Sequence, residues 1–414
     1  MNKSKYILLA AVLLASCTQD ELPQDTPGSG FSGVITFNSP YTATRSNALR
    51  SGDFVEGDQV GVLGFCKASN TVDEVTTDYS TSPWDTKKMF AKPDVFYNQM
   101  LEYQGDGSWT YKWSGTFDNQ GPVGGDSEGG LHPWSTNPDD TFSFFAYYPY
   151  ASGDPNGQDE RKITIDGVEM GTIKLSGADD TGDPTITYTM PHADGGTPTS
   201  TRDWWRVPDF MLAYKTDHLK SNGSVKLNFR HLFSALRFEI NNYNEWDVTI
   251  NELKFGAGEE TENNIKTDGF YRSVTVVGQE SGYSVNPQDS YMGEFQLIGE
   301  EDKYMLDRLV CSAAENNEPS RTTIEYEGEP ITLFFIPDED GHLTFDNNRT
   351  LHINVSMTSD GVDYRDGDFS LPSSTFQAGV CSIFTINIIG NDIYLRVRSD
   401  GKWENEGDSD ITFE

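Results

Sequence analysis

Cysteine and histidine are scarce in this 414-residue chain, and the shortage removes several classes of function. The four cysteines include no C-x-x-C pair, and the six histidines form neither H-x-x-x-H nor H-x-H. A metal site or a disulfide framework is therefore unsupported. No P-loop is present, and the many carboxylates carry no flanking pattern that picks out a glycosidase pair. We predict no enzyme activity, no cofactor and no metal ion.

Basic residues are also few, with 30 Lys and Arg against 65 Asp and Glu, which gives a formal net charge of -35. A field of this sign repels nucleic acid and anionic lipid, so we exclude both as partners. The same charge suits a soluble, exposed surface. Three cysteines remain after Cys17, and Cys311 with Cys381 could either form a bridge or stay as buried free thiols.

Long apolar runs are missing, apart from one short run at the start of the chain. Tyr6 to Ala15 is apolar but shorter than the ~20 residues that a membrane-spanning helix needs. Lys3 and Lys5 precede it, and small residues lead to Cys17. This order predicts a lipoprotein signal over residues 1–16, with the Cys17 thiol carrying the lipid.

The residues after Cys17 predict a flexible acidic tether over 17–30, rich in Pro, Gly, Asp and Ser. The acidic stretch Thr18 to Glu21 resembles a surface-export signal of lipoproteins in some Gram-negative anaerobes. A solvated linker is the other interpretation. We expect the protein to be a lipoprotein exposed on the surface of the cell outer membrane.

Beyond the tether, apolar side chains recur at every second position, as in strands with one buried face. Clear cases are Leu351 to Met357, Phe384 to Ile388 and Ile393 to Val397. Short strands without helical rhythm predict an all-β protein built of β-sandwiches. The polar cluster Asp217 to Ser224 predicts a boundary between an N-terminal domain, 31–218, and a C-terminal domain, 219–414.

Two local features refine this picture. Leu227 and Phe229 lie on one phase of the alternation and Leu236 and Phe238 on the other, which predicts a strand broken near residues 230–235 with a core on both sides. Asp338 to Gly341 predicts a hairpin turn between the apolar run before it and Leu343 after it.

Several stretches, spread over almost the whole mature chain, resemble the fimbrillin-like family, the type V pilins and their relatives. Those stretches are Val34-Ile35-Thr36-Phe37, Thr44-Arg45, Phe54-Val55-Glu56-Gly57-Asp58-Gln59-Val60-Gly61-Val62, Phe144-Phe145-Ala146-Tyr147-Tyr148-Pro149, Pro208-Asp209-Phe210, Leu227-Asn228-Phe229-Arg230-His231-Leu232-Phe233 and Leu333-Phe334-Phe335-Ile336-Pro337. Their order and spacing carry the likeness, since no single motif is decisive.

The resemblance implies two transthyretin-like β-sandwich domains in tandem. It also implies a route of assembly, in which a lipidated precursor reaches the surface and a trypsin-like protease cuts after an arginine. The first strand then leaves, and a segment of another pilin subunit fills the vacated groove. Stalk, tip and anchor subunits all occur in such a family, and an anchor subunit would never be cut.

The sequence offers residues for each part of this route. The strand removed would carry Val34, Ile35 and Phe37, and the cut would follow Arg45 or Arg50 in small, polar surroundings. Both arginines could instead be ordinary solvated side chains. The candidate donor strand is the C-terminal region with Ile393, Leu395, Val397, Ile411 and Phe413. The alternative is that this region simply completes the second sandwich.

A second function stays open beside the fimbrial one. Trp204 and Trp205 are adjacent, so in a strand they would face opposite ways and one could stack on a sugar ring. The chain would then be a lipid-anchored surface protein that binds a glycan. A tryptophan packed at a domain interface is the other explanation. A host protein or glycan receptor is also a conceivable partner of a fimbrial subunit.

Overall fold

The computed structural model describes most of the chain between residues 33 and 412. The described residues are 33–39, 54–67, 93, 95–112, 132–152, 160–165, 167–176, 183–191, 207–258, 260–261, 264–265, 270–279, 282–291, 294–299, 306–326, 329–345, 350–359, 362–371, 374–402 and 410–412.

Four sheets make up most of the described residues, and we number them I to IV. Sheet I contains, in spatial order, β11 (Val225–Lys226), β1 (Phe37–Asn38), β4 (Ser108–Tyr111), β3 (Phe96–Tyr103), β2 (Gln59–Lys67), β5 (Thr141–Tyr148), β10 (Met211–Leu219) and β12 (Arg230–His231). Sheet II contains β18 (Gly282–Tyr291), β17 (Phe270–Gln279), β9 (Thr185–Thr189), β8 (Val168–Leu175), β7 (Glu160–Ile165) and β6 (Ala151–Ser152).

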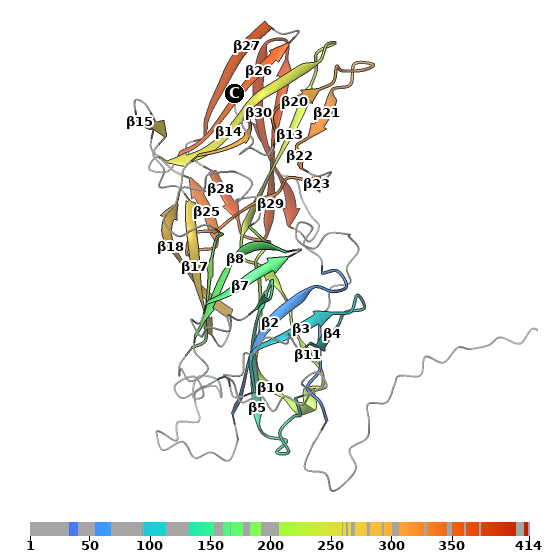
Figure 1. Cartoon of the computed structure of the whole chain (residues 1–414), viewed down its shortest axis with the longest axis vertical. Helices are drawn as coiled ribbons and strands as arrows, with labels where there is room; N and C mark the ends of the chain where they lie inside the picture. Colours follow the sequence, from blue (N-terminus) through green and yellow to red (C-terminus); the bar gives the residue numbers. More distant parts are fainter. Residues whose placement is uncertain are drawn as a thin grey trace, which may run out of the picture.

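Sheets III and IV lie at the other end of the elongated molecule (Figure 1). Sheet III contains β21 (Ser320–Thr323), β13 (Ser234–Asn242), β29 (Val380–Ile389), β30 (Asp392–Lys402) and β31 (Asp410–Thr412), with β24 (Leu333–Phe335) also paired to β13. Sheet IV contains β19 (Glu294–Ile298), β14 (Val248–Gly258), β26 (Thr350–Ser359) and β27 (Val362–Leu371), with β20 (Leu309–Cys311) paired to β14.

Short pieces complete the described structure. They are the pairs β15 (Glu260–Thr261) with β16 (Asn264–Ile265), β22 (Glu325–Tyr326) with β23 (Glu329–Pro330), β25 (His342–Phe345) with β28 (Ser374–Gln377), and the 3-10 turn η1 (Lys220–Asn222). Apart from η1, the described residues contain no helix, so no helix there could cross a membrane. The prediction of an all-β protein is confirmed.

Sheet I curls until its two edges nearly meet. β11 forms one edge and β12 the other, yet only three residues separate Lys226 from Arg230 in the chain. The enclosed side chains form what we call the N-terminal core. Its buried residues are Ile35, Phe37, Phe54, Val60, Val62, Leu101, Tyr103, Trp109, Trp134, Phe142, Phe144, Ala146, Tyr148, Met211, Ala213, Val225, Leu227 and Phe229.

The outer face of the same curl is buried as well, because sheet II covers it. Phe144 and Tyr148 of β5 point into the N-terminal core, whereas Phe145 and Tyr147 between them join the core shared with sheet II. This two-sided burial explains why β5 is an unbroken apolar run instead of an alternating one. Gly61 is required opposite, since a Cβ there would lie 2.4 Å from the Tyr147 ring.

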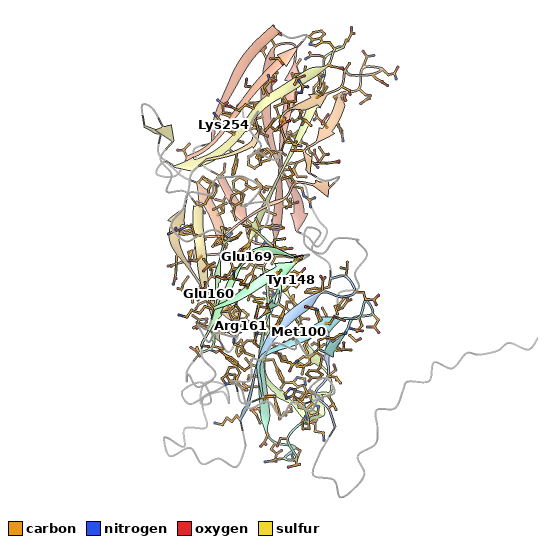
Figure 2. The ribbon with its side chains drawn as sticks, in the orientation of Figure 1. Met100, Tyr148, Glu160, Arg161, Glu169 and Lys254 are labelled. Carbon is orange, nitrogen blue, oxygen red and sulfur yellow. The ribbon has the colours of Figure 1, made fainter. Side chains whose placement is uncertain are left out.

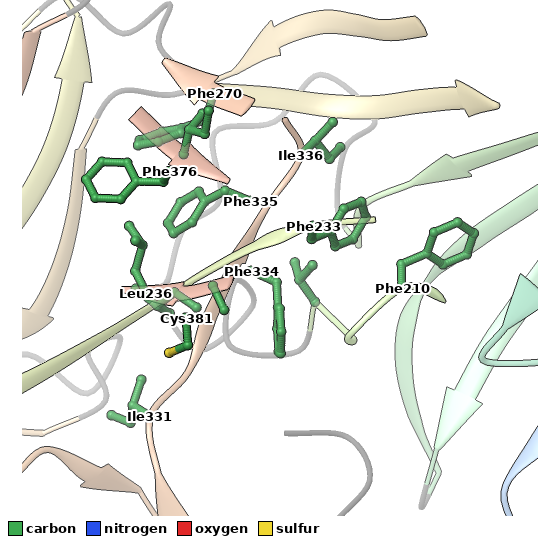
Figure 3. Packing of buried hydrophobic residues seen from close by; sticks show 14 of the residues in the cluster. Phe210, Phe233, Leu236, Phe270, Ile331, Phe334, Phe335, Ile336, Phe376 and Cys381 are labelled. Carbon is green, nitrogen blue, oxygen red and sulfur yellow. The ribbon is translucent and has the colours of Figure 1, made fainter. Parts of the chain in front are cut away.

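A single continuous core joins the two ends of the molecule. At the junction the Phe233 ring lies 5.7 Å from Phe210 and 5.5 Å from Tyr188, and Phe270 lies 4.6 Å from Phe335 (Figure 3). The core continues between sheets III and IV, where Phe238 of β13 lies 5.6 Å from Phe255 of β14. Aromatic contacts of this kind stabilise the junction beyond the area they bury.

Strands from beyond residue 218 complete the first two sheets. β11 and β12 form the edges of sheet I. β17 pairs with β9 in sheet II, and its yellow ribbon lies in the same sheet as green β8 and β7 in Figure 1. The domain boundary predicted between 218 and 219 stays a prediction. The pairing shows that β11 and β12, within residues 225–231, belong to sheet I, and that β17 and β18, within residues 270–291, belong to sheet II.

The predicted strand break is confirmed, and the predicted hairpin is wrong. β12 ends at His231 and β13 begins at Ser234; Leu227 and Phe229 lie in the N-terminal core, and Leu236 and Phe238 in the continuous core. The turn at Asp338 to Gly341 exists, with the Gly341 amide donating to the Asp338 carbonyl at 3.0 Å. The strands on its two sides nevertheless pair elsewhere, β24 with β13 and β25 with β28.

The break is held by a hydrogen bond between a buried aspartate and a histidine. The Asp209 carboxylate is fully buried, and His231 Nδ1 lies 2.9 Å from its Oδ1. Just after the break, the Phe233 carbonyl accepts from the amide of Gly379 at 2.9 Å, which ties the junction to the turn before β29. His231 is therefore a packed, hydrogen-bonded side chain.

The substitution Asp209→Ala should lower the free energy of unfolding by roughly 1.5–3 kcal/mol, because His231 then loses a partner at a buried site. Urea unfolding measures it. Asp139→Ala, at an exposed position, is the matched control and should change stability by about 0.5 kcal/mol or less. Equal losses in the two variants would show that the pair does not hold the junction.

Candidate assembly site

The predicted first strand occupies a slot in the wall of sheet I. β1 lies between β11, which it meets in parallel, and β4, which it meets antiparallel. Phe37 stands opposite Val225 on one side and Trp109 on the other. We call residues 33–39 the slot strand. Because both of its edges are paired, its removal would leave two unpaired edges in the wall.

Backbone hydrogen bonds follow the slot strand along its whole length. The Ile35 amide donates to the His132 carbonyl at 2.8 Å, and the Ser39 amide donates to the Gly107 carbonyl at 2.7 Å. The carbonyls of the slot strand accept as well. The Val225 amide donates to the Thr36 carbonyl at 2.8 Å, and the Leu227 amide donates to the Asn38 carbonyl at 2.9 Å. These bonds fix both the direction and the register of whatever segment lies in the slot.

Only alternate side chains of the slot strand enter the core. Ile35 is 0% exposed and Phe37 is 2% exposed, whereas Val34 is 37% exposed. The Phe37 ring meets Phe144 at 5.3 Å and Tyr111 at 6.1 Å, both edge to face. Burying two such side chains contributes roughly 3–6 kcal/mol before entropy costs.

The fit at the end of the slot strand is incomplete. Asn38 Oδ1, Ser39 Oγ and Trp109 Nε1 are buried, and none finds a hydrogen-bond partner among the described residues. Each unsatisfied buried polar atom costs about 1–3 kcal/mol. The slot therefore holds its own strand less firmly than the apolar contacts alone would suggest.

A partly buried carboxyl lies near the entrance to β2. Asp58 Oδ2 accepts from the Val55 amide at 2.7 Å, and the Tyr148 hydroxyl donates to Asp58 Oδ1 at 3.3 Å. Tyr148 is labelled in Figure 2. Burial raises the pKa of Asp58 to about 6, against the lowering effect of these two bonds. Burial also holds the pKa of Tyr148 well above its ordinary value, so the tyrosine stays a donor.

The candidate donor region divides into two parts. In β30, Leu395 and Val397 are 3% and 6% exposed and Ile393 packs against the same core, so these three side chains help to fill the space between sheets III and IV. β31 follows at the edge of sheet III and pairs with β30 alone among the described strands, with Ile411 opposite Val397. Phe413 lies outside the described residues.

Several of the other predicted positions cannot be located in the fold, whereas two cysteines can. Cys17, Arg45 and Arg50 lie outside the described residues, as does Trp204. Cys311 and Cys381 are buried free thiols, and burial raises the pKa of Cys311 to about 11, which keeps the thiol unreactive. In the part of the chain that the structure describes, no three His, Cys, Asp or Glu side chains gather as metal ligands would.

Sequence reasoning did not find the residues that receive the slot strand. Trp109 and Tyr111 could have been found, because they alternate in a short strand that follows the glycine turn 105–107. Val225 and Leu227 could not, since nothing local marks a parallel pairing with a strand some 190 positions earlier in the chain.

The fold and the slot define a class, namely an all-β protein whose first sheet is completed by a short N-terminal segment that is paired on both edges. A profile of the family described as fimbrillin-like matches residues 133–398, which is more than half of the chain. The chain therefore belongs to the fimbrillin-like family, and the resemblance found in the sequence is confirmed. This is a family of fimbrial proteins.

The solved structures that match come from species of Bacteroides, from Parabacteroides distasonis and from Porphyromonas gingivalis. A fimbrial protein from Bacteroides vulgatus has a TM-score of 0.51 and 18% identity, over 83% of this chain and 92% of that one. A putative cell adhesion protein from Bacteroides ovatus has a TM-score of 0.42 and 12% identity, over 92% and 99%. The tip fimbrial protein Mfa3 from Porphyromonas gingivalis has 0.29 and 9%, over 88% and 97%.

Of these three, only the first exceeds a TM-score of 0.5, and at 18% identity it bears on the fold alone. Among curated protein sequences, none matches the chain.

Phe37→Ala should destabilise the protein by roughly 3–5 kcal/mol, because it empties a buried ring site in the N-terminal core. Val34→Ala, three residues earlier and exposed, should cost about 0.5 kcal/mol or less. Hydrogen exchange localises the effect, since the Val225 and Leu227 amides donate to the slot strand and should exchange faster only in Phe37→Ala. Unchanged protection of these amides would contradict the assigned pairing.

The raised pKa of Asp58 predicts a pH dependence of stability. Between about pH 4 and pH 6 the folded protein keeps a proton that the unfolded chain has released, so the free energy of unfolding falls as pH rises through this window. Relative to Asp58→Asn, the natural chain should lose roughly 3 kcal/mol between pH 4 and pH 7. Urea unfolding at each pH tests this.

Asp106→Asn serves as a control of opposite sign. Hydrogen bonds from the Ser108 hydroxyl and amide lower the pKa of Asp106, so its contribution is lost as pH falls. A constant difference between the natural chain and Asp58→Asn at all pH values would overturn the assignment for Asp58.

Proposed function

We propose that this chain is a structural subunit of a surface fimbria, assembled by removal of the slot strand and strand exchange between subunits, and serving adhesion. The observation that carries the proposal is the slot itself, in which one short segment is paired on both edges and fills a core with Ile35 and Phe37. A vacated slot would expose apolar side chains and unpaired amides, and both favour capture of another strand.

Maturation in this proposal begins at the N-terminus. The chain reaches the outer membrane through a lipid on Cys17, and a trypsin-like protease cuts after Arg45 or Arg50. The cut separates the slot strand from Phe54 and the rest of the fold, so only non-covalent contacts then keep it in place. The unsatisfied atoms of Asn38 and Ser39 weaken that hold and favour exchange.

The replacement strand comes from the C-terminal region of another subunit. Of the candidate residues, we assign this role to Ile411 and Phe413 in preference to Ile393, Leu395 and Val397. The latter three contribute to the core between sheets III and IV, and their withdrawal would open that core. The two halves, 31–218 and 219–414, correspond in this proposal to tandem transthyretin-like domains. The N-terminal domain of one subunit receives the strand that the C-terminal domain of another subunit donates.

A lipid-anchored glycan-binding protein is the second candidate. It draws support from Tyr243, Trp246 and Tyr394, which are 44%, 40% and 48% exposed and present aromatic surface at which sugars could stack. Such a protein would remain uncut and would be retained by a polysaccharide column. A fimbrial subunit would be cut and would polymerise.

The double variant Arg45→Gln, Arg50→Gln should stay at full length on the cell surface and form no polymer, because the slot strand then remains tethered. The measurement is N-terminal sequencing together with a denaturing gel run without heating, which shows polymers as a ladder. Arg321→Gln, at an exposed position in β21, is the control and should mature as the natural chain does. Ladders from the double variant would refute the proposed maturation.

A further inference from the structure

Exposed hydrophobic side chains gather at the end of the molecule that lies farthest from sheet I. β13 begins beside Phe233 at the junction and runs away from sheets I and II, so its last residue lies at the upper end of the molecule in Figure 1. Among the described residues six large hydrophobic side chains are exposed, and all but Val34 belong to this end. These five are Tyr243, Trp246, Val310, Ile389 and Tyr394. Such a concentration is typical of a binding surface.

The strand register places three of these side chains next to one another. β13 and β29 are parallel neighbours, and the Tyr243 amide donates to the Ile388 carbonyl at 2.9 Å. Because Ile388 is buried, Ile389 and its neighbour Tyr243 face outward from sheet III. On β30, Tyr394 stands opposite Asn387 and so lies diagonally across from Ile389, within the reach of an aromatic ring.

Trp246 lies on the connection between β13 and β14, which two buried asparagines hold in place. The Asn242 side chain donates through Nδ2 to the Trp246 carbonyl at 2.8 Å and to the Ser312 carbonyl at 2.9 Å. The Asn244 side chain donates to the Gly390 carbonyl at 3.1 Å and accepts from the Gly390 amide at 2.6 Å. These bonds tie together the connections that follow β13, β20 and β29. A surface that is fixed in advance loses little conformational freedom when a partner binds.

We call Tyr243, Trp246, Ile389 and Tyr394 the distal patch. The three connections that support it carry no lysine or arginine. The exposed acidic side chains on these connections and at the start of β30 are Glu245, Asp247, Glu315, Glu318 and Asp392. The first cations in the flanking chain segments are Arg308, Arg321 and Arg396. The surroundings of the distal patch therefore carry an excess of negative charge.

Rings together with carboxylates favour one kind of partner. A lysine or arginine side chain is attracted both to the face of a tyrosine or tryptophan ring and to a carboxylate. A second copy of this chain, with a net charge of -35, would be repelled. The branched aliphatic side chain of Ile389, which is 49% exposed, adds apolar area that a polypeptide can bury but on which a sugar ring does not stack.

We propose that the distal patch is a docking surface for a basic polypeptide segment of another protein. The arginine or lysine side chains of that segment stack on Tyr243, Trp246 and Tyr394 and pair with the surrounding carboxylates. This inference rests on the adhesive role in the proposed function, and it adds the place of contact and the chemistry of the partner. It does not involve the slot, which belongs to sheet I at the opposite end.

Binding of the purified full-length chain to an immobilised peptide of alternating arginine and serine tests the inference, at ~0.15 M salt so that distant charges are screened. A peptide with neutral citrulline in place of arginine should not bind. Tyr243→Ala and Trp246→Ala should each weaken binding roughly tenfold or more. Val34→Ala removes the exposed hydrophobic side chain of the opposite end and should leave the affinity unchanged. Equal affinities of the natural chain and the two aromatic variants would overturn the inference.

A pair of double variants separates the local charge from the charge of the whole chain. Glu245→Gln with Glu315→Gln removes two carboxylates beside the distal patch and should weaken binding roughly three- to tenfold. Glu56→Gln with Asp139→Asn removes two exposed carboxylates near sheet I and should change the affinity by about twofold or less. The same loss in both double variants would show that the peptide responds only to the net charge, which contradicts a docking surface.

Two further measurements exclude other occupants of the distal patch. A neutral oligosaccharide that binds the natural chain, and loses affinity in Trp246→Ala while the arginine peptide does not, would replace the inference with the glycan-binding candidate. Loss of the polymer ladder on cells carrying Tyr243→Ala with Trp246→Ala would identify the distal patch as a contact between subunits, and this too would overturn the inference.

The assembly route and the docking surface can fail separately. A natural chain that forms ladders on cells but ignores the arginine peptide refutes the docking surface and leaves the proposed assembly standing. A chain that binds the peptide through the distal patch, yet stays uncut and forms no ladder, supports the docking surface and refutes the proposed assembly.

Discussion

The structure depends on one closure, in which a short N-terminal segment completes the wall around the N-terminal core. Sheet I curls so far that residues 225–231 supply both of its edges, and β1 lies between one edge and β4. Ile35 and Phe37 of this segment are buried in the N-terminal core. A wall closed by its own contiguous strands would need no such segment. Here the slot strand is joined covalently to Phe54 and the rest of the fold through residues 40–53. After a cut in that segment, only non-covalent contacts would hold the slot strand in sheet I.

The same geometry connects the slot to the opposite end of the molecule. β11 leads directly into β12, and after the break at residues 232–233 into β13, which pairs in parallel with β29 over eight residue pairs. β29 in turn pairs with β30, the neighbour of β31. In a fimbria of the proposed kind, tension applied at the slot would run along these strands to the C-terminal segment. Strands loaded along their length resist by shearing many hydrogen bonds at once, and the Asp209–His231 pair lies at the break between β12 and β13.

A subunit with a ready-made groove would aggregate before export, because an apolar slot with unpaired edges attracts any strand. In the proposed assembly the slot strand would prevent this, because it occupies the groove until it is removed. Its defects are informative in this respect. Asn38 and Ser39 carry buried atoms without partners, which lowers the cost of release without lowering the apolar complementarity at Ile35 and Phe37.

The sequence by itself determined the all-β class and the strand break near His231, because alternation and local breaks are properties of neighbouring residues. Only the tertiary structure decided that β24 and β25, although a turn joins them, pair with different strands. It also decided that β17 belongs to sheet II and that Phe37 stands between Trp109 and Val225. The reason is physical: strand pairing is a contact between backbones far apart in the chain, which any alternating strand can make, so the choice among partners rests on how the whole core fills.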